Sequence, residues 1–486
     1  MRGMLVAGTT SDAGKSLVTA GICRWLARQG FRVAPFKAQN MSNNSMVCPD
    51  GAEIGRAQWV QAKAAGVVPE AAMNPVLLKP GSDRRSHVVV LGRPHGTIEA
   101  GEYTTGRAGL AEIAFAAFDQ LSKRFDIVVC EGAGSPAEIN LRAGDYVNMG
   151  LARRFGLPVV VVGDIDRGGV LAAMYGTLAL LEAEDQALIA GWIVNKFRGD
   201  LGLLRPGLDE LTRRTGRRVL GVLPWLDRVW IDSEDALAAA GWRAENRPGG
   251  RPLRVAVARF PRASNATDVD ALAAEPGVAV TLTADPDVLA DADIAVLPGS
   301  RATVSDLAWL RERGLADAVL ARAKEGRPVL GICGGYQMLA RTIDDDVESG
   351  AGHVTGLGLL PTKVTFGPEK SLGTPTGRWR DHEVTAYQIH HGMSTVDEGV
   401  EPFLDGCRVG VVWGTTWHGA FENDAFRRAW LTEAAGQAGR TWAPASGAPG
   451  FEALRQDMLD RLADAIAGHL DTDTLLTLIC GGHGGR

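Results

Sequence analysis

Short apolar runs alternate with longer amphipathic segments along this chain, and many of the apolar runs end in glycine or an acidic residue. Strands of parallel sheets are buried on both faces, so they have this continuous apolar character and are joined by helices. Residues 16–29 carry apolar side chains at helical spacing and are followed by Gly30, which predicts a helix and its end. In the first half of the chain the pattern predicts strands at residues 4–8, 32–36, 126–131, 158–164, 189–195 and 219–223.

A stretch rich in glycine, proline and charge, residues 238–252, interrupts this pattern and is typical of a linker. Residues 451–470 predict an amphipathic helix with apolar residues four positions apart. Between these segments, strands are predicted at residues 253–260, 278–283, 294–298 and 328–332, with further β-like pieces at 363–366, 382–389 and 409–413. We therefore expect an α/β protein of two parallel-sheet domains. The predicted boundaries are 1–237 and 253–440 for the domains, 238–252 for the linker, and 441–486 for a helical tail packed on the second domain.

At 486 residues the chain is too long for a single hydrophobic core, which agrees with two domains. It is 45% hydrophobic and 22% charged, and its formal net charge of −6 offers no general attraction to nucleic acid or to an anionic membrane. The start of the chain lacks a signal peptide, and no run of about 18 apolar residues occurs, so we expect a cytoplasmic protein. Six cysteines without a C-x-x-C pair indicate neither disulfides nor a zinc site. These features leave the oligomeric state open.

Residues 8–16, Gly-Thr-Thr-Ser-Asp-Ala-Gly-Lys-Ser, join the first predicted strand to the first predicted helix. In such a loop, backbone N–H groups and the helix N-terminus bind phosphate oxygens, a lysine adds a full charge, and a serine hydroxyl binds Mg²⁺. Five residues separate the two glycines here, whereas the usual spacing is about four. This spacing resembles the loop of dethiobiotin synthetase. The predicted nucleotide-binding residues of the loop are Gly8, Thr9, Ser11, Asp12, Gly14, Lys15 and Ser16.

Acidic residues end two of the predicted strands of the same domain. Glu131 ends strand 126–131, where an acid of a P-loop enzyme meets the metal, so Ser16 and Glu131 are the predicted metal-side residues. Asp164 and Asp166 follow another strand at the sheet edge where open α/β sheets bind ligands, although a structural turn is an equally good interpretation. We therefore expect ATP and Mg²⁺ as cofactors of the first domain.

Residues 331–335, Gly-Ile-Cys-Gly-Gly, follow a predicted strand of the second domain. Small residues on both sides of Cys333 permit the sharp turn that exposes a nucleophile, and the start of the next helix favours the thiolate. The predicted oxyanion donors are the backbone N–H groups of Gly334 and of Gly299, which lies in the loop after strand 294–298. This motif predicts attack on a carbonyl carbon.

A nucleophilic thiol needs a general base, and histidine is the usual one. His418 follows a predicted strand 85 residues after Cys333, in the string Trp-His-Gly-Ala-Phe, and this context makes it the predicted base. His390 and His391, in Tyr-Gln-Ile-His-His-Gly, are the alternatives.

Besides these motifs, the chain contains five longer and more specific strings: Phe36–Ser45, Glu131–Leu141, Tyr146–Gly150, Gly163–Gly169 and Gly331–Gln337. The strings resemble those of the cobyric acid synthase family, the glutamine-dependent amidotransferases of cobalamin biosynthesis. The resemblance covers nearly the whole chain. It implies an N-terminal ATP-dependent P-loop domain similar to dethiobiotin synthetase. It also implies a C-terminal class I glutamine amidotransferase domain with Cys333 as nucleophile and His418 as base.

The same resemblance implies a reaction. ATP phosphorylates side-chain carboxylates b, d, e and g of a corrinoid, adenosylcobyrinic acid a,c-diamide, and ammonia released from glutamine at Cys333 displaces the phosphate to give adenosylcobyric acid. Activation by ATP makes chemical sense, because a carboxylate is a poor electrophile until its oxygen becomes a good leaving group. Lys15, Lys37 and Mg²⁺ would neutralise the charge that builds up during phosphoryl transfer.

One position departs from the class I pattern. Such glutaminases place an acid two residues after the histidine, and this chain has Ala420 there, so we predict a Cys–His pair without an orienting carboxylate.

Two other functions fit parts of the sequence. The first is cobyrinic acid a,c-diamide synthase, but the strings at residues 37–44 and 131–136 do not resemble that enzyme's motifs. The second is a P-loop switch ATPase fused to an inactive glutaminase-like binding module. Such switches carry an extra lysine early in the loop, whereas residues 8–11 contain none, and the presence of Cys333 and His418 also speaks against an inactive module.

Overall fold

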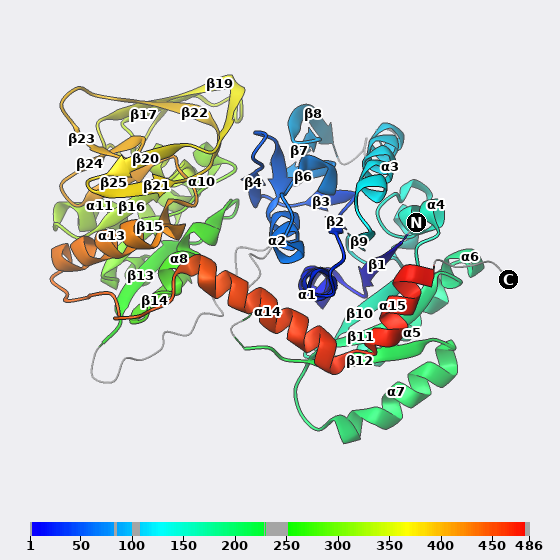
Figure 1. Ribbon diagram of the computed structural model, residues 1–486. Helices are drawn as coiled ribbons and strands as arrows, with labels where there is room; N and C mark the ends of the chain where they lie inside the picture. The colour runs from blue at the N-terminus through cyan, green and yellow to red at the C-terminus, as the bar shows by residue number, and fades with distance from the viewer. Residues whose placement is uncertain (1, 82–84, 100–106, 228, 230–250, 482–486) are drawn as a thin grey trace. The chain divides into compact units, whose positions relative to one another are not determined.

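The structure, a computed structural model, describes residues 2–81, 85–99, 107–227, 229 and 251–481. The chain forms two compact units, each with its own sheets and helices (Figure 1). The first unit contains residues 1–42, 48–231 and 455–486, and the second contains residues 43–47 and 232–454. The predicted linker at residues 238–252 lies outside the described residues except for its last two. Within the described ranges, no helix is both long and apolar enough to cross a bilayer.

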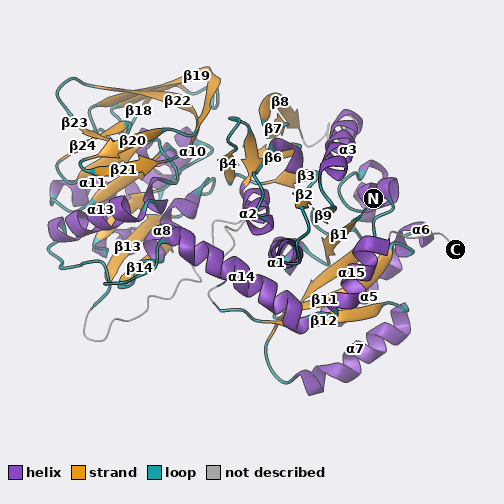
Figure 2. Cartoon of the chain, viewed as in Figure 1, coloured by secondary structure: helices purple, strands orange, loops and turns teal. Residues whose placement is uncertain are grey.

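A parallel six-stranded sheet forms the core of the first unit (Figure 2). The central strand β1 has β9 on one side and β10 on the other, so the loops after these three strands meet at one edge of the sheet. The six strands predicted from apolar runs are confirmed, with ends shifted by one or two residues. Their order is β12 (Arg218–Pro224), β11 (Ile189–Phe197), β10 (Val159–Asp164), β1 (Gly3–Gly8), β9 (Ile127–Glu131) and β2 (Val33–Phe36).

Helices connect these strands. The predicted first helix is present as α1 (Lys15–Arg28), which begins after Gly14, a residue with a φ of +93° that favours glycine. The other helices of the unit that precede the C-terminal tail are α2 (Arg56–Ala65), α3 (Arg107–Arg124), α4 (Met149–Phe155), α5 (Val170–Leu180), α6 (Ala183–Gln186) and α7 (Leu201–Thr215).

A second, smaller sheet lies between β2 and β9 in the chain, and the apolar pattern did not predict it. One of its strands has only three residues and another is largely exposed, so these two lack the long apolar runs of the central sheet. The buried strand at residues 76–80 begins with an apolar run of only three residues. In spatial order the strands are β3 (Gln39–Met41), β6 (Val76–Pro80), β7 (Arg85–Val90) and β8 (Arg93–Glu99). The short strand β5 (Glu53–Gly55) precedes α2.

The C-terminal tail corrects one of our expectations. The predicted amphipathic helix is present as α14 (Phe451–His469) and is followed by α15 (Thr472–Gly481). We expected residues 441–486 to pack on the second domain, but from residue 455 onward the tail belongs to the first unit.

Specific contacts with α1 explain this placement. Asp460 of α14 forms an ion pair with Arg24 at 2.9 Å. A Cβ atom at Gly21 would lie 2.9 Å from Ile466, so the glycine gives α14 the room to pack closely against α1. From residue 455 onward, α14 is thus held against α1 of the first unit.

A seven-stranded sheet forms the core of the second unit. Five strands are parallel. At one edge, the fifth strand pairs antiparallel with the sixth, and the sixth pairs antiparallel with the seventh. The order is β14 (Val278–Thr283), β13 (Leu253–Ala258), β15 (Ile294–Leu297), β16 (Val329–Ile332), β25 (Val412–Thr415), β24 (Gly406–Val409) and β23 (Glu401–Phe403). The helices of the unit are α8 (Asp270–Ala273), α9 (Pro286–Asp291), α10 (Thr303–Glu312), α11 (Leu315–Lys324), α12 (Gly334–Leu339) and α13 (Asp424–Gln437).

Two predicted strands of this unit are each divided in the structure. The piece at 409–413 spans the turn between β24 and β25, because Gly410 has a positive φ that ends one strand before the next begins. The piece at 382–389 covers β21 (His382–Thr385) and the start of β22 (Gln388–Val396). Tyr387, at the break, exchanges two backbone hydrogen bonds of 2.9 Å with His418. The remaining strands are β4 (Ser45–Val47), β17 (Thr342–Asp345), β18 (Gly352–Thr355), β19 (Thr362–Gly373) and β20 (Thr376–Trp379).

Candidate active sites

Cys333 lies on a sharp turn between β16 and α12, as the sequence predicts. Its φ of +49° and ψ of −108° are strained for a residue with a side chain. The neighbouring glycines make the turn possible, because a Cβ at Gly335 would lie 2.0 Å from the carbonyl oxygen of Leu297. The Cys333 N–H donates to the carbonyl of Thr415 at 2.8 Å, which fixes the turn to the end of β25. This is the geometry of a nucleophile elbow.

His418 lies in the loop after β25 and is fully buried. Its Nδ1 donates to Oδ2 of Asp268 at 2.6 Å, and Oδ1 of Asp268 accepts the N–H of Gly419 at 2.7 Å. Burial alone would lower the pKa of His418, but the Asp268 carboxylate and the nearby Cys333 raise it to about 10. Nε2 makes no hydrogen bond of good geometry to any described residue, so it is the nitrogen available for proton transfer.

The expectation of a Cys–His pair without a carboxylate is therefore wrong. Asp268, on the single-turn helix Ala266–Val269, contacts His418 from a point 150 residues earlier in the chain. Position 420 is indeed an alanine, but the acid comes from the loop region after β13 instead. An aspartate following the first strand of a parallel-sheet domain is the signal that could have identified it, because ligand sites form at that edge.

The two alternative histidines lack such a partner. His390 is buried, its Nδ1 faces the carbonyl of Gly392 at 2.9 Å, and burial is the main reason that its pKa is lowered. His391 faces the carbonyl of Gly367 at 3.3 Å, and burial lowers its pKa as well. Neither histidine hydrogen-bonds a carboxylate among the described residues, so the geometry favours His418 as the base.

The structure brings both predicted oxyanion glycines to the elbow. A Cβ at Gly334 would lie 2.7 Å from the nitrogen of Ser300, and a Cβ at Gly299 would lie 2.8 Å from Cε1 of His418. The next N–H, that of Gly335, already donates to the carbonyl of Pro298 at 3.0 Å. The loop after β15 and the start of α12 therefore lie in direct contact beside Cys333 and His418.

In the first unit, the side chain of Lys15 folds back onto the loop between β1 and α1. Lys15 Nζ donates to the carbonyls of Thr10 at 2.8 Å and Ser11 at 3.0 Å, and to that of Gly134 at 3.2 Å. A Cβ at Gly8 would lie 2.9 Å from the Lys15 side chain, which explains the glycine at that position. Three backbone carbonyls, two of them from the predicted loop, thus surround one buried ammonium group.

Further contacts fix the rest of this loop. The Thr9 N–H donates to the carbonyl of Val162 at 2.9 Å, and Lys196 Nζ donates to the carbonyl of Asp12 at 2.9 Å and to the carboxylate of Asp164 at 2.7 Å. The Asp164 carboxylate also accepts the N–H of Asp166 at 2.8 Å. The Asp164 carboxylate is therefore hydrogen-bonded both to Lys196 and to the backbone of its own turn.

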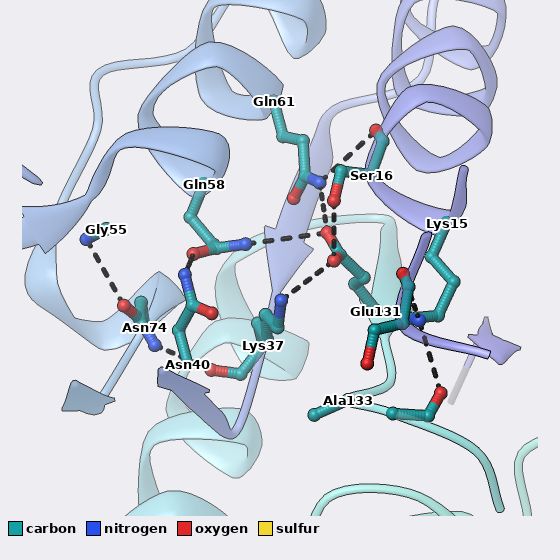
Figure 3. Close-up of polar contacts among 12 residues, drawn as sticks. Lys15, Ser16, Lys37, Asn40, Gly55, Gln58, Gln61, Asn74, Glu131 and Ala133 are labelled. Atoms are coloured by element: carbon teal, nitrogen blue, oxygen red, sulfur yellow. Dashed lines mark hydrogen bonds and ion pairs between the residues drawn. The ribbon is translucent and has the colours of Figure 1, made fainter. Parts of the chain in front are cut away.

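Glu131 lies at the centre of the predicted metal site (Figure 3). One carboxylate oxygen accepts from the Ser16 hydroxyl at 2.8 Å and from Lys37 Nζ at 2.9 Å. The other accepts from Gln61 and Gln58 of α2. Burial raises the pKa of Glu131, but the charge of Lys37 and these hydrogen bonds outweigh it, so the pKa is lowered and the group is ionised.

This donor set fits Mg²⁺. A hydroxyl and an ionised carboxylate are hard oxygen ligands, and Mg²⁺ in nucleotide sites uses only one or two carboxylates besides phosphates and water. Ser16 and Glu131, which were predicted as the metal-side residues, lie within hydrogen-bond distance of each other. Gln58 and Gln61 were not predicted as site residues, although their spacing of three puts both on one face of α2.

Comparisons with known proteins agree with the two-unit fold. Residues 4–237 match the family described as CobQ/CobB/MinD/ParA nucleotide binding domain. Residues 254–426 match the CobB/CobQ-like glutamine amidotransferase domain. A solved glutamine amidotransferase structure covers 37% of this chain and 98% of its own at 20% identity, but its TM-score of 0.31 is too low to carry an argument.

Three relatives named cobyric acid synthase match almost end to end. The protein from Cutibacterium acnes is 61% identical over 483 residues, covering 99% of this chain and 100% of the relative. The one from Mycobacterium tuberculosis is 60% identical, covering 98% and 97%. The one from Streptomyces avermitilis is 59% identical, covering 98% and 96%. The predicted fold class and the predicted enzyme class are confirmed, and the chain belongs to the cobyric acid synthase family.

Proposed function

We propose that this enzyme uses ATP and glutamine to convert the b, d, e and g carboxylates of adenosylcobyrinic acid a,c-diamide into amides, giving adenosylcobyric acid. The observation that supports the proposal is the presence of two candidate sites in one chain. The second unit holds Cys333 on an elbow with His418 and Asp268 nearby. The first holds a phosphate-type loop with Lys15 and the Ser16–Glu131 pair.

The second unit would release ammonia. The Cys333 thiolate attacks the amide carbon of glutamine, and the N–H groups of Gly299 and Gly334 stabilise the oxyanion. When the C–N bond breaks, the leaving nitrogen takes a proton from His418 Nε2 and departs as ammonia. A water molecule, deprotonated by His418 Nε2, then attacks the thioester carbon. The C–S bond breaks, glutamate is released, and the Cys333 thiolate and the His418 cation are restored. Asp268 keeps the imidazole in the required tautomer and stabilises its cation.

The first unit would activate the corrinoid carboxylate. A carboxylate oxygen attacks the γ-phosphorus of ATP, and ADP leaves. Lys15 and Lys37 neutralise the charge on the transferred phosphoryl group. Mg²⁺, held by Ser16 and Glu131, would add further neutralisation at the phosphate oxygens. Ammonia then attacks the acyl phosphate, phosphate leaves, and an amide remains. We place this reaction in the cytoplasm, because both ATP and glutamine are available there.

Two substitutions test the proposal in the full-length enzyme. With Mg-ATP and the corrinoid present, Cys333→Ala should abolish amidation from glutamine but retain amidation from ammonium chloride, measured as glutamate release and product mass. Lys15→Ala should abolish both, since activation of the carboxylate fails. Full glutamine-driven amidation in Cys333→Ala would contradict the assignment of the thiol, and full activity in Lys15→Ala would contradict the role of the loop.

The same assay separates the alternatives. Cobyrinic acid a,c-diamide synthase would amidate the a and c carboxylates of cobyrinic acid and leave the a,c-diamide unchanged. A switch ATPase with an inactive second module would hydrolyse ATP without releasing glutamate. The strained elbow and the His418–Asp268 bond support an active glutaminase over the latter interpretation.

A further inference from the structure

The turn that precedes Asp268 supports two parts of the glutaminase site. At its end, the Asp268 N–H donates to the carbonyl of Asn265 at 3.2 Å. At its start, the Ser264 N–H donates to the carbonyl of Gly299 at 2.9 Å, and Ala263 forms a β-bridge with Ser300. The position of this turn therefore sets both the carboxylate that contacts His418 and the loop that carries a predicted oxyanion donor.

Asn265 has the unusual backbone conformation of this turn. Its φ of +49° is the left-handed region, which asparagine tolerates better than most residues but which still needs support from its surroundings. The side chain is buried, with 3% of its surface exposed. Without fixed partners for its backbone and side chain, an asparagine in this conformation would have other turn geometries open to it.

The partners come from residues 43–47, a short segment near the start of the chain that belongs to the second unit. Oδ1 of Asn44 accepts the backbone N–H of Asn265 at 2.7 Å. In return, Oδ1 of Asn265 accepts the backbone N–H of Ser45 at 2.8 Å. Asn44 is 2% exposed and Ser45 is fully buried, so both bonds are shielded from water.

We propose that Asn44 is a positioning residue for glutamine hydrolysis. It holds the backbone of Asn265, so that Asp268 orients His418 and Gly299 stays beside the elbow. This inference rests on the proposed glutaminase function of Cys333. It assigns a role in that reaction to a residue that lies in the N-terminal half of the sequence, inside the stretch that otherwise forms the first unit.

The test uses the full-length enzyme and the substitution Asn44→Ala, which removes the acceptor for the Asn265 N–H. Small displacements of catalytic groups cost about a hundredfold in rate, so we expect kcat for glutamine hydrolysis to fall by roughly ten- to a hundredfold. KM for glutamine should change little, and amidation from ammonium chloride should be retained. Asn44→Asp keeps the accepting oxygen and should recover most of the activity.

A second readout separates positioning from a general loss of stability. The rate at which iodoacetamide alkylates Cys333, followed by peptide mass spectrometry across pH, depends on the imidazolium of His418. We expect the pH profile of Asn44→Ala to move in the same direction as that of Asp268→Asn, by a smaller amount. Should Asn44→Ala not fold, Asn44→Leu fills the space of the side chain, likewise removes the acceptor for the Asn265 N–H, and should give the same shift.

Asp285→Ala is a control for the loss of one side chain–backbone hydrogen bond at an exposed position of the same unit. Asp285 lies in the same unit and caps α9 by accepting the Asp287 N–H at 2.9 Å, so its loss also removes one side chain–backbone bond. It should lower Tm without changing kcat or the alkylation profile. The proposal is overturned if Asn44→Ala keeps the wild-type kcat and profile, or if Asp285→Ala reduces kcat equally. Failure of the proposed function looks different, because the wild-type enzyme itself would then release no glutamate.

Discussion

Asp268→Asn tests the site of the second unit most directly. Asparagine keeps the shape of the side chain and one accepting oxygen, but it removes the negative charge that faces Nδ1 of His418 at 2.6 Å. Burial disfavours the cationic form of His418. The Asp268 carboxylate, and to a smaller extent Cys333, outweigh burial and raise the pKa of His418 from 6.5 to about 10. This rise corresponds to roughly 5 kcal/mol in favour of the cation. Without the carboxylate, the larger of the two interactions that favour the cation is lost, so the balance shifts toward the neutral imidazole.

The expected loss of activity is large. In a serine protease, the equivalent Asp→Asn change in the triad lowers kcat about 10⁴-fold because the imidazole takes the wrong tautomer. We expect kcat for glutamine hydrolysis to fall by about 10²–10⁴-fold in Asp268→Asn, with little change in KM. The assay is glutamate release at saturating glutamine with Mg-ATP and corrinoid. Amidation driven by ammonium chloride in the same preparation should be unchanged.

Asp345→Asn is a matched control, because Asp345 is equally buried in the same unit and its carboxylate accepts three backbone N–H groups, those of Val347, Glu348 and Ser349. It makes no contact with His418 and should leave kcat unchanged. A wild-type kcat in Asp268→Asn would refute the role of the carboxylate. An equal loss of the ammonium-driven reaction would show that the change disturbs the fold instead.

Three further predictions follow from individual contacts. Glu131→Gln should reduce ammonium-driven amidation by at least about a hundredfold, because Lys37 loses its buried ion-pair partner at 2.9 Å. Release of phosphate measures this loss, and release of glutamate should persist. His418 has a raised pKa in the folded state, so its contribution to stability is complete below pH 6.5 and is lost as the pH rises toward about 10. The difference in Tm between the wild type and His418→Gln should shrink across that range. Gly21→Leu should lower the free energy of unfolding by about 1–3 kcal/mol in urea denaturation, because Ile466 fills that space.

The sequence predicted the parts of the fold that have strong local signals. All six central strands of the first unit are continuous apolar runs, and all six are present. The apolar pattern gave the wrong strand where a single glycine makes a turn. Gly410 divides one apolar run into two antiparallel strands. The pattern also failed for the tail, because an amphipathic helix shows which face is buried but not which surface buries it.

The same distinction holds within the sites. Cys333 and Ser16 lie in motifs whose residues are neighbours in the chain, and the structure places them as predicted. Asp268 lies 150 residues from His418, and only the fold brings its carboxylate to the imidazole. Gln58 and Gln61 contact Glu131 for the same reason. When a partner residue lies on another element, its distance along the sequence from the residue it contacts is not fixed, so a motif search cannot find it.

The string at residues 36–45 contributes one buried side chain to each site. Lys37 pairs with Glu131 in the first unit, and seven residues later Asn44 holds Asn265 in the second. A glutaminase that ran without an activated carboxylate would waste glutamine, so a short segment shared by both sites is suited to link their activities. We therefore expect glutamine hydrolysis to be faster with Mg-ATP and corrinoid than without them, and this ratio to fall toward one in Asn44→Ala. In Asp268→Asn both rates should fall while the ratio persists, because the hold on Asn265 is intact. An unchanged ratio in Asn44→Ala would show that the segment supports the turn without linking the two sites.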